Sequence, residues 1–117
     1  MDTNKAILAL GALAQTTRLE TFRLLVRHEP DGIPAGELAR LIEVPQNTMS
    51  AHLATLSRAG LVTSERQSRS IIYRGDLNGL RALTLFLLKD CCGGSTELCA
   101  PLIAELTPCY GPEAKLS

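Results

Sequence analysis

The chain has 117 residues, enough for one small domain with a modest hydrophobic core. Aromatic residues make up 3% of it, so leucine, isoleucine, valine and alanine must fill that core, and leucine and alanine favour helices. No signal peptide follows Met1, and the most apolar run, residues 83–88, is far shorter than the roughly 20 residues of a membrane span. We therefore expect a cytoplasmic protein without membrane contact, in a compartment that keeps thiols reduced.

The charges are balanced overall but unevenly placed. Basic and acidic residues each number 12, and the formal net charge is zero. Between Gln46 and Arg74, however, there are four arginines and one acidic residue, which give a local net charge of +3. A basic segment in a neutral protein is what a surface that binds a DNA groove requires.

Two helices are predicted near the start of the chain. Apolar residues recur at helical spacing over residues 3–14 and again over residues 16–26. Thr16 or Thr17 can cap the second helix, because a hydroxyl there accepts a hydrogen bond from an amide of the first turn. Glu20 completes an approximate capping box.

Two shorter helices, over residues 35–42 and 45–59, follow a predicted turn at residues 30–32. In the second of them apolar residues lie on one face, and the opposite face carries small and polar residues. Two short helices joined by a tight turn, the second with such an outer face, describe a helix-turn-helix. For His52, packing between helices is an equal alternative to contact with DNA. The candidate DNA-binding residues here are Gln46, Asn47, Thr48, Ser50, Ala51, His52 and Arg58.

A β-hairpin and a last helix complete the predicted domain. The hairpin pairs residues 61–63 with 70–74, and its basic tip adds Arg66 and Arg69 as DNA-binding candidates. The last helix runs from Asp76 or Asn78 to about Asp90 and is apolar on nearly every side. Such a helix must be covered, and a second subunit is the expected cover. The predicted dimer interface consists of Ile7, Leu10, Leu80, Leu83 and Leu87.

All the cysteines lie in a short segment behind this domain, as Cys91, Cys92, Cys99 and Cys109. We therefore divide the chain into a DNA-binding and dimerisation domain, residues 1–90, and a cysteine-containing tail, residues 91–117. A group of soft thiolates in one segment indicates a site for a soft ion. Cys109, next to Pro108, is the weaker candidate ligand. The alternatives are zinc or cadmium, with Cys109 as a fourth ligand, and a redox pair. A thiol-dependent enzyme is disfavoured, because no glycine-rich loop precedes a cysteine.

The order of helix, helix, helix-turn-helix, hairpin and helix is that of a winged helix-turn-helix. Residues 46–62 resemble the recognition helix of the ArsR family of bacterial metal-sensing repressors, with Ser50, then His52-Leu53, then Ala59-Gly60-Leu61-Val62. Residues 17–19 and 37–39 match earlier helices of that family. The resemblance implies a mainly α fold (α-α-α-α-β-β-α), and a homodimer joined by its first and last helices. It also implies that both recognition helices dock into successive major grooves of operator DNA.

The resemblance also bears on the sensing site. Some family members carry cysteines just after the Glu-Leu of the third helix. This chain has no cysteine there, because Glu37-Leu38 is followed by Ala39-Arg40-Leu41. The zinc site of the last helix is excluded, because no histidine follows His52. Cys91, Cys92 and Cys99 resemble the C-terminal three-cysteine site of some arsenic and antimony sensors. The expected protein has no constitutive cofactor and releases DNA when As(III) or Sb(III) binds. Its wing lacks the glycine that is common at the family's hairpin tip.

Overall fold

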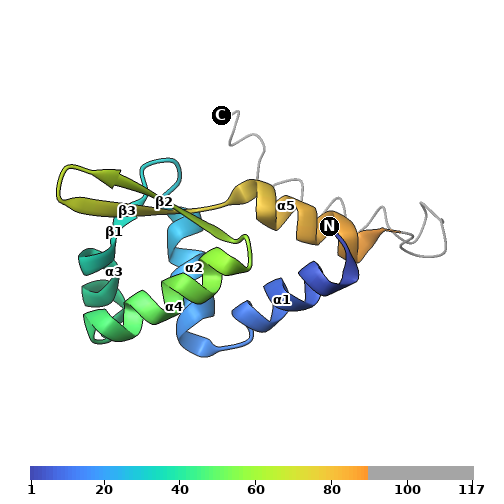
Figure 1. The fold of residues 1–117 in the computed structure, drawn as a ribbon, viewed down its shortest axis with the longest axis horizontal. Helices are drawn as coiled ribbons and strands as arrows, with labels where there is room; N and C mark the ends of the chain where they lie inside the picture. Colours follow the sequence, from blue (N-terminus) through green and yellow to red (C-terminus); the bar gives the residue numbers. More distant parts are fainter. Residues whose placement is uncertain (90–117) are drawn as a thin grey trace. The chain divides into compact units, whose positions relative to one another are not determined.

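The computed structural model describes residues 1–89; residues 90–117 lie outside this description. The chain divides into two compact units, Met1–Phe86 and Leu87–Ser117, and the packing reported below is that of the first. Within residues 1–89, no helix is long and apolar enough to cross a membrane. In chain order the elements are α1 (Thr3–Leu13), α2 (Thr16–Arg27), β1 (Ile33–Pro34), α3 (Ala35–Ile42), α4 (Gln46–Arg58), β2 (Val62–Gln67), β3 (Ser70–Gly75) and α5 (Leu77–Leu88), as Figure 1 shows.

This order is that of a winged helix-turn-helix, so the predicted fold class is confirmed. The helix caps differ in part from the prediction. Gln15, rather than Thr16 or Thr17, caps α2: its backbone is extended, and its side-chain oxygen accepts a hydrogen bond from the Arg18 amide at 2.8 Å. Asp76, one of the two residues at which the last helix was predicted to begin, precedes α5 and accepts a hydrogen bond from the Gly79 amide at 3.1 Å. The last helix ends at Leu88, slightly before the predicted end at about Asp90.

The core is built mainly from leucines on four helices and on the segment after α4. On α1 it is alanines that face inward, whereas the larger Ile7, Leu8 and Leu10 are exposed. The small alanine side chains let α1 lie close to α2 and α4, which it contacts. The fully buried large side chains are Leu25, Leu38, Met49, Leu53, Leu56, Leu61 and Thr21.

Gly60 ends the recognition helix α4 and turns the chain toward the wing. Its φ is +78°, a left-handed conformation that glycine adopts without steric cost. The Gly60 amide donates to the Ser57 carbonyl at 3.0 Å, and the Leu61 amide donates to the Leu56 carbonyl at 3.1 Å. These two bonds satisfy carbonyls that the helix end leaves without partners, and they place β2 directly behind α4.

The wing is an antiparallel sheet with strand order β1-β3-β2. The sequence did not predict β1, a two-residue strand in which Ile33 pairs with Tyr73. The hairpin closes with Gln67 opposite Ser70, so Ser68 and Arg69 form its tip. Ser68 has a φ of +58°, so it occupies the left-handed position where glycine would be the usual residue.

Candidate DNA-binding and sensing sites

The buried side chains of α4 are those that the sequence assigned to the inner face of the recognition helix, so this prediction is confirmed. Met49, Leu53 and Leu56 have 0% exposure, and the Thr21 hydroxyl of α2 lies 3.9 Å from the Met49 sulfur. The residues that the sequence assigned to DNA contact are, His52 apart, exposed: Gln46, Asn47, Thr48, Ser50, Ala51 and Arg58. The fold therefore leaves these side chains accessible to a DNA groove.

Short-range hydrogen bonds order polar side chains of this face. The Asn47 carboxamide oxygen accepts from the Thr48 amide at 2.9 Å, at the start of α4. Near the end of the helix, the Thr55 hydroxyl donates to the Ala51 carbonyl at 3.2 Å, and Arg58 donates to the same hydroxyl at 3.4 Å. Arg58 is thus held along the helix, which lowers the entropy it would lose on contacting a phosphate.

His52 is half-buried and lies toward α2. Its Nδ1 is 3.3 Å from a guanidinium nitrogen of Arg18. Burial, and then the positive charge of Arg18, lower the pKa of His52 below its ordinary value of 6.5. The structure thus gives His52 the packing role that the sequence left open, and its contact with DNA stays a prediction.

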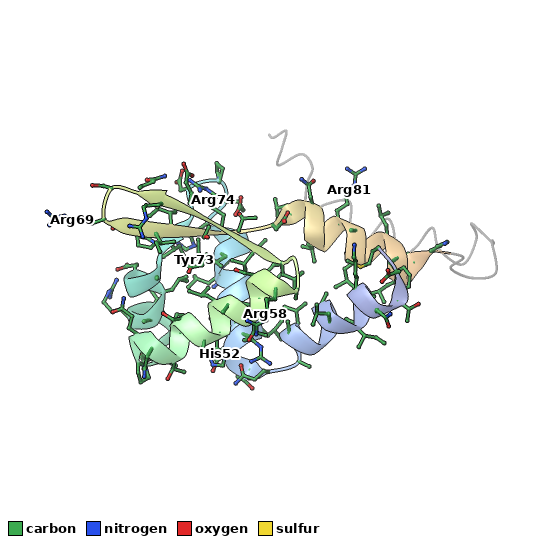
Figure 2. The ribbon with its side chains drawn as sticks, in the orientation of Figure 1. His52, Arg58, Arg69, Tyr73, Arg74 and Arg81 are labelled. Atoms are coloured by element: carbon green, nitrogen blue, oxygen red, sulfur yellow. The ribbon has the colours of Figure 1, made fainter. Side chains whose placement is uncertain are left out.

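The arginines of the wing fall into two kinds. Arg66 and Arg69 are exposed, and Figure 2 shows Arg69 projecting from the hairpin tip. Arg74, counted with the basic segment in the sequence, instead donates to the Glu65 carboxylate at 2.8 Å and to the Pro30 carbonyl at 2.9 Å. Within residues 1–89, neither Arg66 nor Arg69 takes part in an ion pair. They are the basic side chains with which the wing can meet a phosphate backbone.

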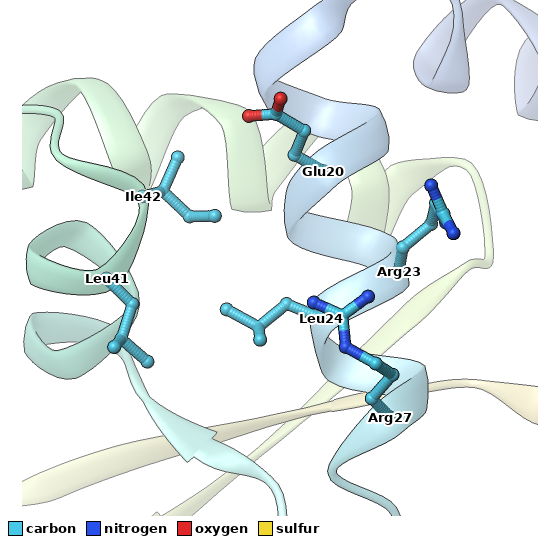
Figure 3. A pocket seen from close by; sticks show the side chains of 6 residues that line it. All are labelled: Glu20, Arg23, Leu24, Arg27, Leu41 and Ile42. Carbon is cyan, nitrogen blue, oxygen red and sulfur yellow. The ribbon is translucent and has the colours of Figure 1, made fainter.

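A groove between α2 and α3 provides a contrast to this surface. It has a volume of about 370 Å³ and lies against the exposed side of α2 (Figure 3). Arg23 and Arg27 line it, whereas Thr21, which faces α4, lies on the buried side of α2. These two arginines therefore serve as a charge-matched control for the wing.

We expect the double variant Arg66→Ala/Arg69→Ala to bind operator DNA more weakly and with a flatter dependence on salt. Each lost phosphate contact should reduce the slope of log affinity against log salt by about one unit. Fluorescence anisotropy at several salt concentrations measures both quantities. Arg23→Ala/Arg27→Ala should behave like the parent, and equal effects of the two double variants would remove the wing from the interface.

The predicted dimer surface needs one correction. Ile7 and Leu10 are exposed on α1, as an interface requires, and Leu80 is half-buried. Leu83, in contrast, has only 3% exposure in the single chain and belongs to that chain's own core, so it offers no surface to a partner. Leu85 has 57% exposure and replaces Leu83 as the candidate interface residue of α5. The fifth predicted residue, Leu87, belongs to the second unit.

Leu85→Asp is therefore expected to give a folded monomer. A carboxylate at an exposed position costs the single chain little, but it would be buried without a partner in an apolar interface. Light scattering and circular dichroism measure mass and helix content. Leu41→Asp on α3, at a similarly exposed leucine, is the matched control and should stay in the parent's oligomeric state. A Leu85→Asp protein with the parent's mass would place the interface elsewhere.

The four candidate ligand thiols, Cys91, Cys92, Cys99 and Cys109, lie outside the described residues. Within residues 1–89, no group of three or more histidine, cysteine, aspartate or glutamate side chains is arranged to hold a metal ion. The described part of the chain therefore offers no competing metal site of that size.

Comparison with known proteins supports the fold and defines its family. A model of a helix-turn-helix domain matches residues 13–65. The transcriptional activator HlyU of Vibrio cholerae is 31% identical over 88 residues, which cover 75% of this chain and 79% of that protein. The transcriptional repressor SmtB of Mycobacterium tuberculosis is 47% identical over 38 residues, 32% of this chain and 28% of that protein.

Three solved structures have a fold similar to that of this chain. Reduced HlyU from Vibrio cholerae has a TM-score of 0.61 at 29% identity and covers 77% of this chain and 92% of its own. A homodimeric winged helix-turn-helix domain from Mycobacterium bovis, described as a possible ArsR-family regulator, has a TM-score of 0.62 at 24% identity (73% and 77% covered). A possible transcriptional regulator for arsenical resistance has a TM-score of 0.60 at 30% identity (68% and 79% covered).

The fold and the exposed face of α4 thus define a winged helix-turn-helix DNA-binding protein. Together with the match to HlyU, they show that the chain belongs to the ArsR family of transcriptional regulators. Because its relatives are regulators of transcription, the prediction that the chain is not an enzyme is confirmed.

Proposed function

We propose that the chain is a cytoplasmic, homodimeric repressor that binds operator DNA and releases it when As(III) or Sb(III) binds Cys91, Cys92 and Cys99. The observation that carries this proposal is the grouping of every cysteine of the chain behind α5. A trivalent metalloid is soft and three-coordinate, and three thiolates are a matching donor set. The likeness to a possible regulator for arsenical resistance, at 30% identity, supports the same ligand class.

Release follows from linkage between the two binding events. If the metalloid favours the DNA-free state, it must bind that state more tightly, and DNA must weaken metalloid binding by the same factor. α5 connects the cysteine segment to the core through Leu83, so a shift of this helix can alter how the two recognition helices are presented.

A redox-responsive regulator is the second candidate. In it, Cys99 pairs with Cys91 or Cys92 under an oxidant. The relative HlyU has been solved in a reduced form, which keeps thiol oxidation in consideration for this chain. A zinc- or cadmium-responsive repressor would draw on the same cysteines and on Cys109, because zinc prefers four ligands.

One titration separates these functions. Operator DNA, recovered by selection from a random duplex pool, is labelled and its anisotropy is followed with arsenite, antimonite, zinc, cadmium or hydrogen peroxide. Release by arsenite or antimonite at protein-equivalent concentrations, with zinc, cadmium and peroxide inactive, is the expected result. Release by peroxide with loss of two titratable thiols per chain would replace metalloid sensing by redox sensing.

A further inference from the structure

Arg18, in the first turn of α2, connects three helices. Its backbone amide is capped by Gln15, so the residue is fixed at the helix start. Its Nε donates to the carbonyl of Ala12 at 2.6 Å, and its Nη1 lies 3.3 Å from Nδ1 of His52 on α4. One planar guanidinium thus joins the end of α1 to the middle of the recognition helix. We call this pair of contacts the Arg18 bridge.

Each contact of the bridge pairs a donor of the Arg18 guanidinium with an acceptor on another helix. Ala12 lies in the last turn of α1, where carbonyls lack partners within the helix and carry partial negative charge. An arginine only donates hydrogen bonds, so Nδ1 of His52 must be the acceptor and the imidazole must be neutral, with its proton on Nε2. The lowered pKa of His52 agrees with this neutral form at pH 7.

The two helices that the bridge joins have different exposed faces. α1 buries its alanines and exposes Ile7, Leu8 and Leu10, which form part of the predicted dimer surface. α4 buries Met49 and Leu53 and exposes the predicted DNA-contacting face. The hydrophobic contacts between them are non-directional, whereas the Arg18 bridge fixes a direction through two hydrogen bonds.

We propose that Arg18 is a positioning residue that holds α4 at a fixed angle to α1 and so sets the separation of the two recognition helices in the dimer. It does this without touching DNA. The inference rests on the proposed DNA-binding face and dimer, and it assigns to Arg18 and His52 the preference for one spacing between operator half-sites. A dimer reads two half-sites about one helical turn apart, so a small rotation of α4 misaligns one of them.

The test compares full and half operators. Duplexes from the selection are used with the original half-site spacing, with one base pair inserted or deleted, and as a single half-site. Arg18→Met should bind the full operator about tenfold more weakly, within the usual range of coupling between sites, and should lose the preference for spacing. Its affinity for the single half-site should stay within about twofold of the parent.

His52→Leu provides a second route that leaves the contact with Ala12 intact. It should show the same loss of spacing preference, and the double variant should be no weaker than Arg18→Met alone, because Arg18→Met already removes the contact with His52. His52→Gln, whose side-chain oxygen can still accept from Arg18, should restore most of the preference. Equal losses on full and half operators in Arg18→Met would overturn the proposal. A parent protein that selects no duplex at all would instead overturn the proposed function.

A pH profile gives a readout that loss of packing alone does not change. As the pH falls below 6.5 toward the lowered pKa of His52, protonation places a hydrogen on Nδ1 opposite the Arg18 guanidinium, the charged group of α2 that acts on this imidazole. The parent should then lose its spacing preference, and His52→Gln should keep it. His28, the other histidine, contacts the Leu24 carbonyl at the far end of α2, so His28→Gln is the control. The same pH dependence of the spacing preference in the parent and in His52→Gln would overturn the bridge.

Discussion

Cys91→Ser, Cys92→Ser and Cys99→Ser are each expected to abolish release of operator DNA at arsenite concentrations that suffice for the parent, and to leave the affinity for DNA unchanged. A pyramidal, three-coordinate ion that loses one thiolate must replace a soft ligand by water or a serine hydroxyl, which it binds poorly. The arsenite concentration for half-maximal release should rise by more than about 100-fold, because loss of an outer-shell partner already costs metal sites 10–100-fold. The predicted DNA-contacting residues lie within 46–69, so these variants should retain operator binding.

Cys109→Ser is the matched control, because it removes a thiol of the same segment that the proposed site does not use. It should release DNA at nearly the parent's arsenite concentration. A Cys99→Ser protein that responds normally, beside a Cys109→Ser protein that does not, would show that Cys109 is the third ligand. Full release by all four variants would exclude a three-thiolate site.

A methylated arsenical refines the same experiment. One of its three positions is blocked by carbon, so two thiolates are enough to hold it. We therefore expect one of the three single variants to release DNA with methylarsenite while failing with arsenite. That variant identifies the cysteine that contributes least to the site, and anisotropy with both compounds measures the difference.

The sequence predicted the recognition helix well, because its signal is local. Met49, Leu53 and Leu56 stand at i, i+4 and i+7, and this spacing alone assigns one helical face to the core. Gly60 marks the end of the helix because a left-handed residue is required there. The hairpin was likewise evident from its β-branched and aromatic residues.

The features that the sequence missed depend on contacts between distant residues. β1 has only two residues, so it has no alternation of its own and exists because β3 supplies its partner. Arg74 was counted in the charge of the basic segment, and its pairing with Glu65 becomes visible only when β2 and β3 align. The approach of Arg18 to His52 spans 34 positions and leaves no periodic signal.

Leu83 shows why an apolar helix does not by itself identify a dimer interface. Its position in α5 is as apolar as that of Leu85, and the sequence gives no means of separating a residue covered by its own chain from one covered by a partner. Packing separates them: Leu83 contacts the core cluster, whereas Leu85 is exposed. For the cysteines, the type of donor predicts the class of ligand, and the geometry of the site stays a prediction.

The second large effect that we predict is a loss of stability in Gly79→Ala, which follows from the contact between the first turn of α5 and the segment after α4. The first turn of α5 lies against Gly60 and Leu61, the segment that follows α4, where the Asp76 amide donates to the Leu61 carbonyl at 2.8 Å. A β-carbon on Gly79 would collide with the carbonyl oxygen of Gly60. Because both groups are backbone, neither can rotate away as a flexible side chain would.

We expect Gly79→Ala to lower the free energy of unfolding by about 1–2 kcal/mol. Alanine favours a helix over glycine by ~1 kcal/mol, but inserting a carbon into a filled space costs about 1–3 kcal/mol or more, and here the backbone must move. Thermal unfolding followed by circular dichroism should show a fall in Tm of roughly 4–16 °C.

Gly36→Ala on α3 is the matched control, because it makes the same chemical change without the collision. The nearest atom to a β-carbon there is Nε2 of Gln46 at 3.7 Å, an ordinary van der Waals contact. Its Tm should stay equal or rise by a few degrees, since alanine reduces the entropy of the unfolded chain. If Gly79→Ala proved as stable as Gly36→Ala, then α5 would not press on the end of α4. A displacement of α5 would then have no direct backbone route to the recognition helix.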